Sequence, residues 1–405
     1  MRDRTTRRGR GEPGEMRVNT YSTKWLKKGF PWVYPKEVVS GQPAPGDTVV
    51  IRSETGELLG TGIADSGWLA ARIYRKDEGE LDGEWLDGVM ERASALRDRI
   101  LPGETSAYRL VNGENDGLPG IRVDWWGYFA VIALDTPAAA PLLELIVDWL
   151  RLHKQPRGIV TCWRQDPRDE RDFSEAKPEP GVYWGHPPTS DVRVRERGML
   201  VDVSPLEAPD VGLYCDMRDV RAWLEPSWGG TSVLNLFAFT GVFGLAAALA
   251  GASDVVSVDL SGRSLERAES NFRINGLDPE NSEFLAEDVF KALDRYRRTG
   301  QTFDRIIVDP PSFSRGPQGV WSAKKDWPRL AAAAARVCAP DGWLILCSNQ
   351  GEVSPREFRG LVQDGLERAG RPAQLLASLG QAADFPAATW FPEGRYLKVD
   401  IYRVL

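Results

Sequence analysis

Histidine and cysteine are scarce in this chain. Of its 405 residues, two are histidines, His153 and His186, and four are cysteines. The cysteines lie far apart and form no Cys-x-x-Cys pair, so we expect neither a zinc site nor a disulfide framework, and a reducing cytoplasm is favoured. With so few imidazoles, we expect no histidine-based catalysis and no metal site.

Long hydrophobic runs and an excess of positive charge are also missing. No stretch is long enough to cross a membrane and no signal peptide is evident, which predicts a cytoplasmic protein without a membrane partner. The net charge is −7 and the pI about 5.3, the wrong sign for an evident nucleic-acid binder, although one local basic face would suffice. The hydrophobic content of 42% is that of a globular protein, and the length predicts two to three domains.

The N-terminal part of the chain predicts a tail followed by a small β domain. Residues 1–15 are basic and lack apolar periodicity, which is typical of a disordered tail. Residues 16–88 contain short apolar runs at 48–51, 58–63 and 69–74, separated by turn residues. Short strands at such spacing predict a small barrel.

Basic residues stand beside aromatic residues near the start of this β domain. Lys24, Lys27 and Lys28 precede Trp32 within a few positions. Lysines bind phosphates and aromatic rings stack on bases, so this cluster is a candidate RNA-docking surface. An ordinary solvated surface has the same composition, and both interpretations stay open.

Residues 89–188 predict a middle α/β domain that ends in a linker. Helices are expected at 89–100 and 141–153, with strands between them. Residues 112–120 are rich in Asn, Asp and Gly, which predicts a tight loop with positive φ at its glycines. Residues 165–188 are polar, charged and proline-bearing, and we expect a flexible connection there.

Residues 189–405 predict a doubly wound α/β domain built around one strand–turn–helix–strand unit. The unit spans 233–260, with Gly241 and Gly244 in the turn and Asp259 closing the second strand. Glycines allow a ligand to approach the backbone, and an acid at this position can bind a ribose diol. The full G-x-G-x-x-G pattern is absent, so an ordinary βαβ unit remains an alternative at this point.

Two later features favour S-adenosylmethionine over a dinucleotide as the ligand. Asp288 follows a predicted third strand, in place to meet an adenine. Asp309, Pro310 and Pro311 follow a fourth predicted strand and form a rigid, outward-facing lip. Ligands of open α/β sheets bind at this carboxyl edge, and the chain shows no second phosphate-binding turn.

Together these residues resemble one known family, from about residue 24 to the C-terminus. The chain is similar to the bacterial large-subunit rRNA methyltransferases typified by 23S rRNA methyltransferase I, which makes 5-methylcytosine. The resemblance implies a PUA barrel, a middle α/β domain and a Rossmann-like class I methyltransferase domain that uses S-adenosylmethionine on RNA, with 23S rRNA as the expected partner. It is carried by residues 108–120, 212–218, 234–244, 259, 288–290, 309–313 and 391–398.

The resemblance also implies which residues bind the cofactor. Asp259 would hold the ribose hydroxyls, Asp288 the adenine amino group, and Val289 would lie beside the ring. Asp309 and Pro310 would lie near the methyl group and the target base. The remaining positions would line the methionine and ribose end or the neighbouring wall of the pocket: Asn235, Phe237, Thr240, Gly241, Tyr214 and Arg218.

The chain departs from the family at the residue that cytosine chemistry needs. Cytosine C5 is a poor nucleophile, and a cysteine thiolate must first add at C6. Aligned on Gly342 and Gly351, that position holds Asn349, and Cys347 lies two residues upstream. Met217 and Val211 also stand where the family has other residues, which weakens the prediction of polar contacts in that segment.

The segments around Asp309 and Asn349 instead look like the related enzyme that methylates guanine N7 in 23S rRNA. Guanine N7 is already nucleophilic, so alignment with the methyl group is sufficient. Asn349, with Ser312 and Ser314, would hydrogen-bond a flipped base, and Phe313 would stack on it. We therefore expect Asp309, Asn349 and Phe313 to form the catalytic group.

Other functions remain open from the sequence. Cys347 could still serve a cytosine mechanism if the strand register were shifted. A protein or small molecule could be the methyl acceptor, which would suit the acidic pI. The chain could also be a non-catalytic RNA-binding or ribosome-assembly protein that retains the fold. The oligomeric state is open, a homodimer included.

Overall fold

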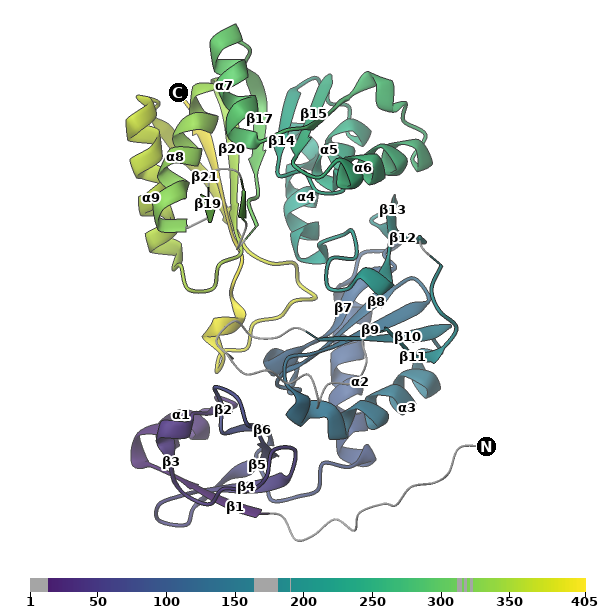
Figure 1. Ribbon diagram of the computed structural model, residues 1–405, viewed down its shortest axis with the longest axis vertical. Helices are drawn as coiled ribbons and strands as arrows, with labels where there is room; N and C mark the ends of the chain where they lie inside the picture. The colour runs from purple at the N-terminus through teal and green to yellow at the C-terminus, as the bar shows by residue number, and fades with distance from the viewer. Residues whose placement is uncertain (1–13, 164–180, 190, 312–314, 317–318, 321–322) are drawn as a thin grey trace. The chain divides into compact units, whose positions relative to one another are not determined.

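The computed structural model describes residues 14–163, 181–189, 191–311, 315–316, 319–320 and 323–405. Phe313, Ser312, Ser314, most of the predicted tail and most of the predicted linker lie outside these residues. The described chain forms two units (Figure 1). We call them the N-terminal unit (residues 1–100, 109–188 and 386–394) and the C-terminal unit (residues 101–108, 189–385 and 395–405).

A six-stranded sheet begins the N-terminal unit. Its order is β2-β6-β5-β4-β1-β3, and only the β1–β4 pair is parallel. The first strand starts at Gly14, inside the segment that the sequence predicts as a tail. The elements are β1 (Gly14–Val18), α1 (Thr20–Lys27), β2 (Trp32–Val33), β3 (Val38–Ser40), β4 (Thr48–Ser53), β5 (Leu58–Ala64) and β6 (Ala71–Arg75).

A five-stranded sheet follows, in the order β11-β10-β9-β8-β7, with two helices that contact each other. Strand β11 lies within the predicted linker, so part of that segment belongs to the sheet. The elements are α2 (Gly83–Ile100), β7 (Ala107–Asn112), β8 (Ile121–Trp126), β9 (Phe129–Leu134), α3 (Leu143–His153), β10 (Gly158–Trp163) and β11 (Gly181–Gly185).

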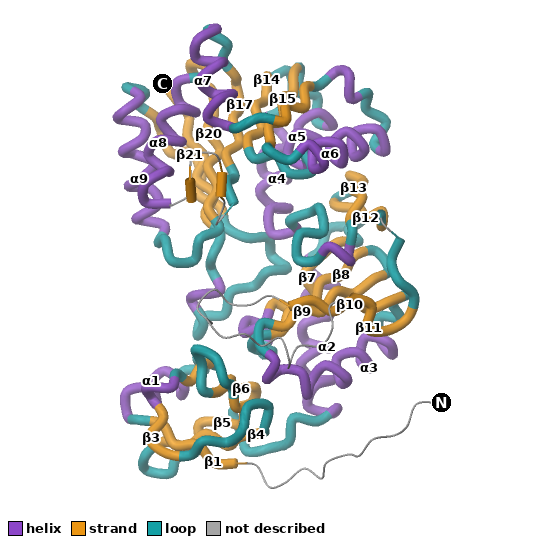
Figure 2. The backbone as a smooth tube through the Cα atoms, viewed as in Figure 1, coloured by secondary structure: helices purple, strands orange, loops and turns teal. Residues whose placement is uncertain are grey.

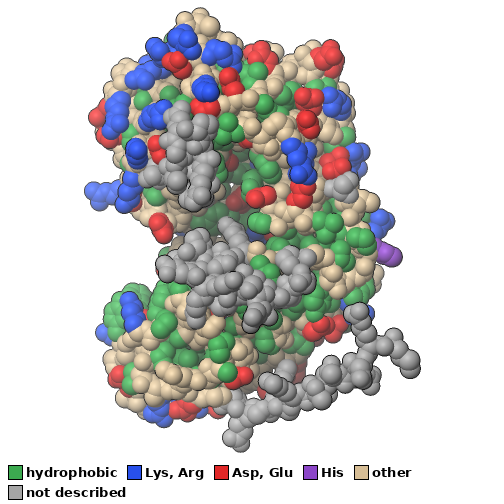
Figure 3. All heavy atoms as spheres, in the orientation of Figure 1, with side chains coloured by type: hydrophobic (Ala, Val, Ile, Leu, Met, Phe, Trp, Pro, Cys, Tyr) green, Lys and Arg blue, Asp and Glu red, His purple; other side chains and the backbone are tan. Residues whose placement is uncertain are grey.

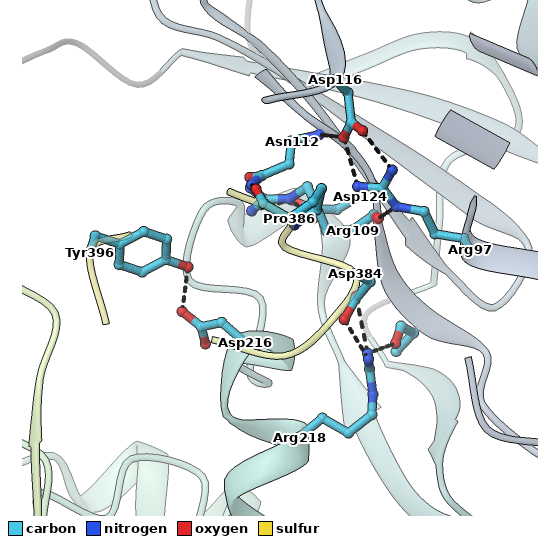
Figure 4. Close-up of polar contacts among 11 residues, drawn as sticks. Arg97, Arg109, Asn112, Asp116, Asp124, Asp216, Arg218, Asp384, Pro386 and Tyr396 are labelled. Atoms are coloured by element: carbon cyan, nitrogen blue, oxygen red, sulfur yellow. Dashed lines mark hydrogen bonds and ion pairs between the residues drawn. The ribbon is translucent and has the colours of Figure 1, made fainter. Parts of the chain in front are cut away.

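A segment from late in the sequence completes the N-terminal unit. Residues 386–394 group with it, although the sequence predicts a single domain over 189–405. The Nδ2 of Asn112 donates to the carbonyl of Pro386 over 3.0 Å (Figure 4). The ring of Phe391 packs 4.7 Å from that of Trp32. The loop at 112–120 therefore has a structural role, and its glycines 113, 117 and 120 have positive φ as predicted.

The C-terminal unit is organised by a seven-stranded sheet in the order β16-β15-β14-β17-β20-β22-β21. The five strands β16, β15, β14, β17 and β20 are parallel to one another. Strand β22 is antiparallel to both of its neighbours, β20 and β21. The strands are β14 (Ser232–Leu236), β15 (Asp254–Asp259), β16 (Glu283–Ala286), β17 (Phe303–Val308), β20 (Cys338–Ser348), β21 (Ala373–Leu379) and β22 (Lys398–Val404).

Helices cover both faces of this sheet (Figures 1 and 2). One face buries Leu234, Ile306 and Leu346 under the α7–α9 side, and the other buries Val233, Ile307 and Cys347 under the α4–α6 side. The helices are α4 (Arg218–Leu224), α5 (Val242–Leu249), α6 (Gly262–Ile274), α7 (Val289–Thr299), α8 (Ala323–Arg336) and α9 (Pro355–Ala369). The unit also contains two hairpins, β12–β13 (Val192–Glu196, Met199–Val203) and β18–β19 (Arg315–Gly316, Gly319–Val320).

The strand order reverses direction at β14, since β15 and β16 extend to one side of it and β17 and β20 to the other. At such a switch point the loops after adjacent strands diverge and leave room for a ligand at the carboxyl edge. The doubly wound prediction is confirmed. No helix among the described residues is long and apolar enough to span a bilayer.

Candidate active site at the carboxyl edge of the sheet

The loop after β14 has an unusual backbone. Phe237 and Phe239 have φ values of 59° and 50°, in the left-handed region that non-glycine residues seldom adopt, and Gly241 follows at 72°. The Asp259 carboxylate holds this loop by accepting the N–H of Phe239 over 2.8 Å, and it also accepts the N–H of Ser261 over 2.9 Å. Strain held in place by neighbouring bonds is common where a backbone surrounds a ligand.

Thr240 and Gly241 attach the same loop to α6. The buried Thr240 hydroxyl donates to the carbonyl of Gly212 over 2.5 Å, and Asn271 Nδ2 donates to the carbonyl of Thr240 over 3.1 Å. A Cβ on Gly241 would lie 2.6 Å from the Cβ of Ala268, so no larger residue fits. The described contacts of Thr240 are therefore with the protein.

Two buried polar groups lie below this loop. Asn235 and Ser257 are register partners on β14 and β15, with 2% and 0% of their surface exposed. Within the described residues, Asn235 Nδ2 and Ser257 Oγ have no hydrogen-bond partner. Such groups normally have one. Both atoms lie close to Gly244 of α5, between the helix and the sheet. The strained loop and Asp259, at the ends of β14 and β15, fit a polar ligand such as S-adenosylmethionine.

Asp288 and Val289 begin α7. The Asp288 carboxylate caps the helix by accepting the N–H of Lys291 over 3.1 Å, and its side chain remains half-buried. Val289 is 4% exposed and packs in the core. The cap fixes the carboxylate beyond the end of β16, in the row of strand ends that also holds Asp259.

Asp309 follows β17 and has a shifted pKa. The side chain is half-buried, which corrects the sequence-based expectation of an exposed, outward-facing position. Loss of hydration, together with the nearby Asp216 and against the opposing effect of Arg221, raises the pKa of Asp309 to about 7. Asp309 thus changes its charge near neutral pH, whereas most aspartates are ionised there.

Asp216 and Tyr214 lie near this position, and Tyr396 contacts Asp216. The Tyr396 hydroxyl donates to Asp216 over 2.7 Å (Figure 4), a contact that the sequence analysis missed because the residues lie 180 positions apart. Tyr214 donates to Asp210 over 2.8 Å, and its ring lies 5.4 Å from that of Phe239. Burial raises the pKa of Tyr214, and Asp210, Asp309 and Asp216 add to the shift.

Arg218 is held by contacts within the C-terminal unit. Its guanidinium is buried, pairs with Asp384 over 2.6 Å and donates to the carbonyl of Ala107 over 2.7 Å (Figure 4). These contacts join α4 to distant segments of the C-terminal unit. The described contacts of Arg218 are thus structural ones, and none supports the predicted contact with the cofactor.

Cys347 and Asn349 differ sharply in their surroundings. Cys347 lies inside β20 with none of its surface exposed. Burial raises the pKa of its thiol well above the usual value, and Asp309 and Asp216 raise it further. Asn349 follows the last residue of β20 and is exposed. A reactive thiolate needs access and a lowered pKa, so Cys347 is in an unsuitable position.

The predicted RNA-contacting residues of the N-terminal unit separate into two groups. Lys24, Lys27 and Lys28 are exposed at α1, where Lys27 pairs with Glu57 over 2.6 Å. Trp32 is buried at 7% exposure, and its indole N–H donates to Glu114 over 2.9 Å. Its ring is therefore not available to stack on a base, which corrects the expectation for this residue.

The fold and the strand-end constellation agree with comparisons to known proteins. Residues 178–387 match the family model of S-adenosylmethionine-dependent methyltransferases, and residues 16–76 match that of PUA-like domains. Ribosomal RNA large subunit methyltransferase I of Aeromonas salmonicida is 35% identical over 93% of this chain and 95% of its own length. The protein of the same name from Shewanella denitrificans is 34% identical over 94% and 96%.

The chain belongs to this methyltransferase family. Its cofactor is S-adenosylmethionine. Two solved structures share the fold at 24% identity, each covering 96% of this chain and 100% of its own. One is a methyltransferase complexed with SAH, with a TM-score of 0.86, and the other a SAM-dependent methyltransferase from Streptococcus mutans, with a TM-score of 0.84.

Proposed function

We propose that this methyltransferase modifies a base of 23S rRNA, and that the base is a guanine methylated at N7. The curated relatives are named as ribosomal RNA large subunit methyltransferases, and the chain carries a PUA-like domain in front of the methyltransferase domain. Both observations support RNA as the substrate.

The surroundings of Cys347 and Asn349 support guanine over cytosine. Methylation of cytosine C5 needs a thiolate that reaches C6 of the base. The thiol in this region is enclosed in β20 and its pKa is raised, while the exposed position just beyond the strand is an amide. Guanine N7 needs no covalent activation, so an amide that orients the base is sufficient.

The roles of the site residues follow from their places at the strand ends. S-adenosylmethionine supplies an electrophilic methyl group when bound. In our proposal Asp259 holds the ribose, Asp288 the adenine amino group, and Val289 packs beside the ring. The methionine and ribose end is lined by Asn235, Phe237, Thr240, Gly241 and Tyr214.

The target base would lie between Asp309 and Asn349. An ionised Asp309 can accept hydrogen bonds from the N–H groups of guanine, and the Asn349 amide can both donate and accept. Phe313 is proposed to stack on the base. These three form the proposed catalytic group, which aligns N7 with the methyl group.

Docking of the RNA is proposed to involve α1. Lys24, Lys27 and Lys28 supply positive charge, and the neighbouring Tyr21 and Trp25 are 66% and 48% exposed. Figure 3 shows acidic and basic side chains interspersed over the visible face of the C-terminal unit. The basic and aromatic side chains at α1 would therefore provide a local RNA-binding surface on a chain whose net charge is −7.

Methylation of cytosine C5 through Cys347 is the second candidate, because the resemblance to 23S rRNA methyltransferase I points to that product. It would require β20 to move so that the thiol becomes accessible. One experiment separates the candidates: transfer of labelled methyl groups to protein-free rRNA from a strain that lacks this gene, followed by nucleoside mass spectrometry.

Labelled 7-methylguanosine is the expected product. Labelled 5-methylcytidine would overturn the guanine proposal and restore Cys347 as the nucleophile. Absence of label on free rRNA and on ribosomal particles, with S-adenosylmethionine binding intact by calorimetry, would exclude the RNA substrate and favour a protein or small-molecule acceptor. Absence of S-adenosylmethionine binding would leave only a non-catalytic RNA-binding role.

A further inference from the structure

A buried lysine lies directly beside the strand end that carries Asn349. Lys398 is the first residue of β22, and its register partner is Ser348, the last residue of β20. Only 6% of Lys398 is exposed. An ammonium group loses much of its hydration when it is buried, so lysine is rarely found in such a position without a compensating function.

The ammonium group binds the loop that follows β20. Nζ donates to the carbonyl of Gln350 and, over 3.0 Å, to the carbonyl of Val353. Within the described residues it forms no ion pair. Asp400, two residues along β22, instead pairs with Arg359 over 3.1 Å and accepts the Ser378 hydroxyl over 2.6 Å. Lys398 is therefore directed to backbone carbonyls rather than to a carboxylate.

The two carbonyls enclose a short loop with fixed ends. Val353 N–H donates to the carbonyl of Gln350 over 3.2 Å, and the Val353 side chain is buried. Ser354 then caps α9 by accepting the N–H of Glu357 over 3.2 Å. On the other side, Asn349 is exposed and connects the loop to β20. The Lys398 side chain thus connects the beginning and the end of the loop that follows Asn349.

Stability alone does not account for this lysine. Burial lowers the pKa of Lys398 to about 8, which shows that the site disfavours the charged form. A methionine has similar length and no desolvation penalty, but it could not donate to the two carbonyls, so its two effects on stability oppose each other. The arrangement instead favours a loop held in one conformation.

We propose that Lys398 is a positioning residue that fixes residues 349–353 and thereby sets where Asn349 meets the target base. The inference rests on the proposed function, which assigns Asn349 to the base. It predicts that loss of the ammonium group lowers the rate of methyl transfer without affecting the cofactor site.

The test compares Lys398→Met with Lys398→Arg and with a control, Tyr402→Phe, on the same strand. We expect Lys398→Met to lower kcat for rRNA methylation by about 10- to 100-fold, the size of effect of a misplaced reacting group. The KM and Kd for S-adenosylmethionine should stay within about twofold, and Tm should change little, because removal of the buried charge offsets the loss of two hydrogen bonds. Lys398→Arg should recover part of kcat, and Tyr402→Phe should match the wild type.

A wild-type kcat in Lys398→Met would overturn the inference, and so would a parallel fall of Tm, cofactor affinity and kcat. Amide hydrogen exchange gives a readout that does not depend on the substrate. Exchange in residues 349–353 should become faster in Lys398→Met and stay unchanged in Tyr402→Phe. If wild-type enzyme leaves rRNA unmodified, the proposed function fails, and unchanged exchange in Lys398→Met would separately reject the positioning role.

Discussion

The aspartate at the end of β15 and the one that follows β17 have different surroundings. Asp259 accepts two backbone N–H groups, those of Phe239 and Ser261. Asp309 lies in a poorly hydrated position near Asp216, and its pKa is raised to about 7. Pairs of acids with such different environments commonly divide binding and chemistry between them.

The raised pKa of Asp309 makes stability depend on pH. In the unfolded chain this carboxyl ionises near pH 4, whereas in the native state it keeps its proton up to about pH 7. The native state binds more protons across this interval, so the wild-type free energy of unfolding falls as pH rises from about 4 to 7. Asp309→Asn should lack this decline, exceed the wild type in stability at pH 8, and lose methyl transfer.

Urea unfolding of both proteins at pH 5 and pH 8 measures this effect. An equal pH dependence in the two proteins would show that Asp309 has an ordinary pKa. Full activity in Asp309→Asn would remove the carboxylate from the catalytic group.

Cys347→Ala tests whether the reaction uses a cysteine nucleophile. If guanine is the target, the variant should keep wild-type kcat and lose about 1 kcal/mol of stability, because the smaller side chain leaves a void in the core. Single-turnover methylation and thermal unfolding measure the two quantities. Complete loss of transfer with cofactor binding preserved would favour the cytosine mechanism.

At the scale of elements, α4 is attached through Arg218. Replacing one member of a buried ion pair leaves the other charge without compensation and costs about 3–5 kcal/mol. Arg218→Met should therefore lower the free energy of unfolding by this amount, because Asp384 remains buried. Unfolding in denaturant and calorimetric cofactor binding distinguish the roles: unchanged stability with weaker cofactor binding would restore the cofactor contact predicted from the sequence.

The helix α1 presents a mixed aromatic and basic stripe. Tyr21, Lys24, Trp25 and Lys28 follow the i, i+3, i+4, i+7 spacing of one helix face, and the Lys28 ammonium lies 4.9 Å from the Trp25 ring. Stacking of a base on an aromatic side chain contributes about 1–3 kcal/mol. Trp25→Ala should therefore weaken RNA binding by roughly 5- to 150-fold, leaving cofactor affinity unchanged.

Filter binding of rRNA fragments at fixed salt measures this loss. Leu152→Ala, a substitution at an exposed apolar position on α3, serves as the control and should bind as the wild type does. Equal affinity of Trp25→Ala and the control would remove α1 from the RNA surface.

Local patterns predicted elements well and side-chain partners poorly. The strand predicted ahead of Asp288 is present as β16, and the helix predicted at 89–100 ends where α2 ends. By contrast, Trp32 was interpreted from its basic neighbours in sequence, but Phe391 covers it. For Arg218 the resemblance implies a place beside the cofactor pocket, whereas its described ion pair is with Asp384, 166 residues away. Periodicity reports which face is buried, whereas a distant partner leaves no local signal.

At the scale of the whole molecule, the doubly wound architecture was predictable and the division of the chain into units was not. The doubly wound sheet follows from alternating strand and helix signals. Residues 386–394 carry nothing in their own sequence that assigns them to the N-terminal unit, because the decisive contacts are with Asn112, Asn115 and Trp32. The domain boundaries predicted at 88 and 188 therefore describe only part of the organisation.

The chain passes between its two units five times, after residues 100, 108, 188, 385 and 394. Protein synthesis proceeds from the N-terminus, and domains generally fold as they emerge. Here the N-terminal unit cannot acquire Phe391 until almost the entire polypeptide has been made. Completion of the first unit is thus delayed to the end of translation, and neither unit can be transplanted into another protein as one uninterrupted cassette.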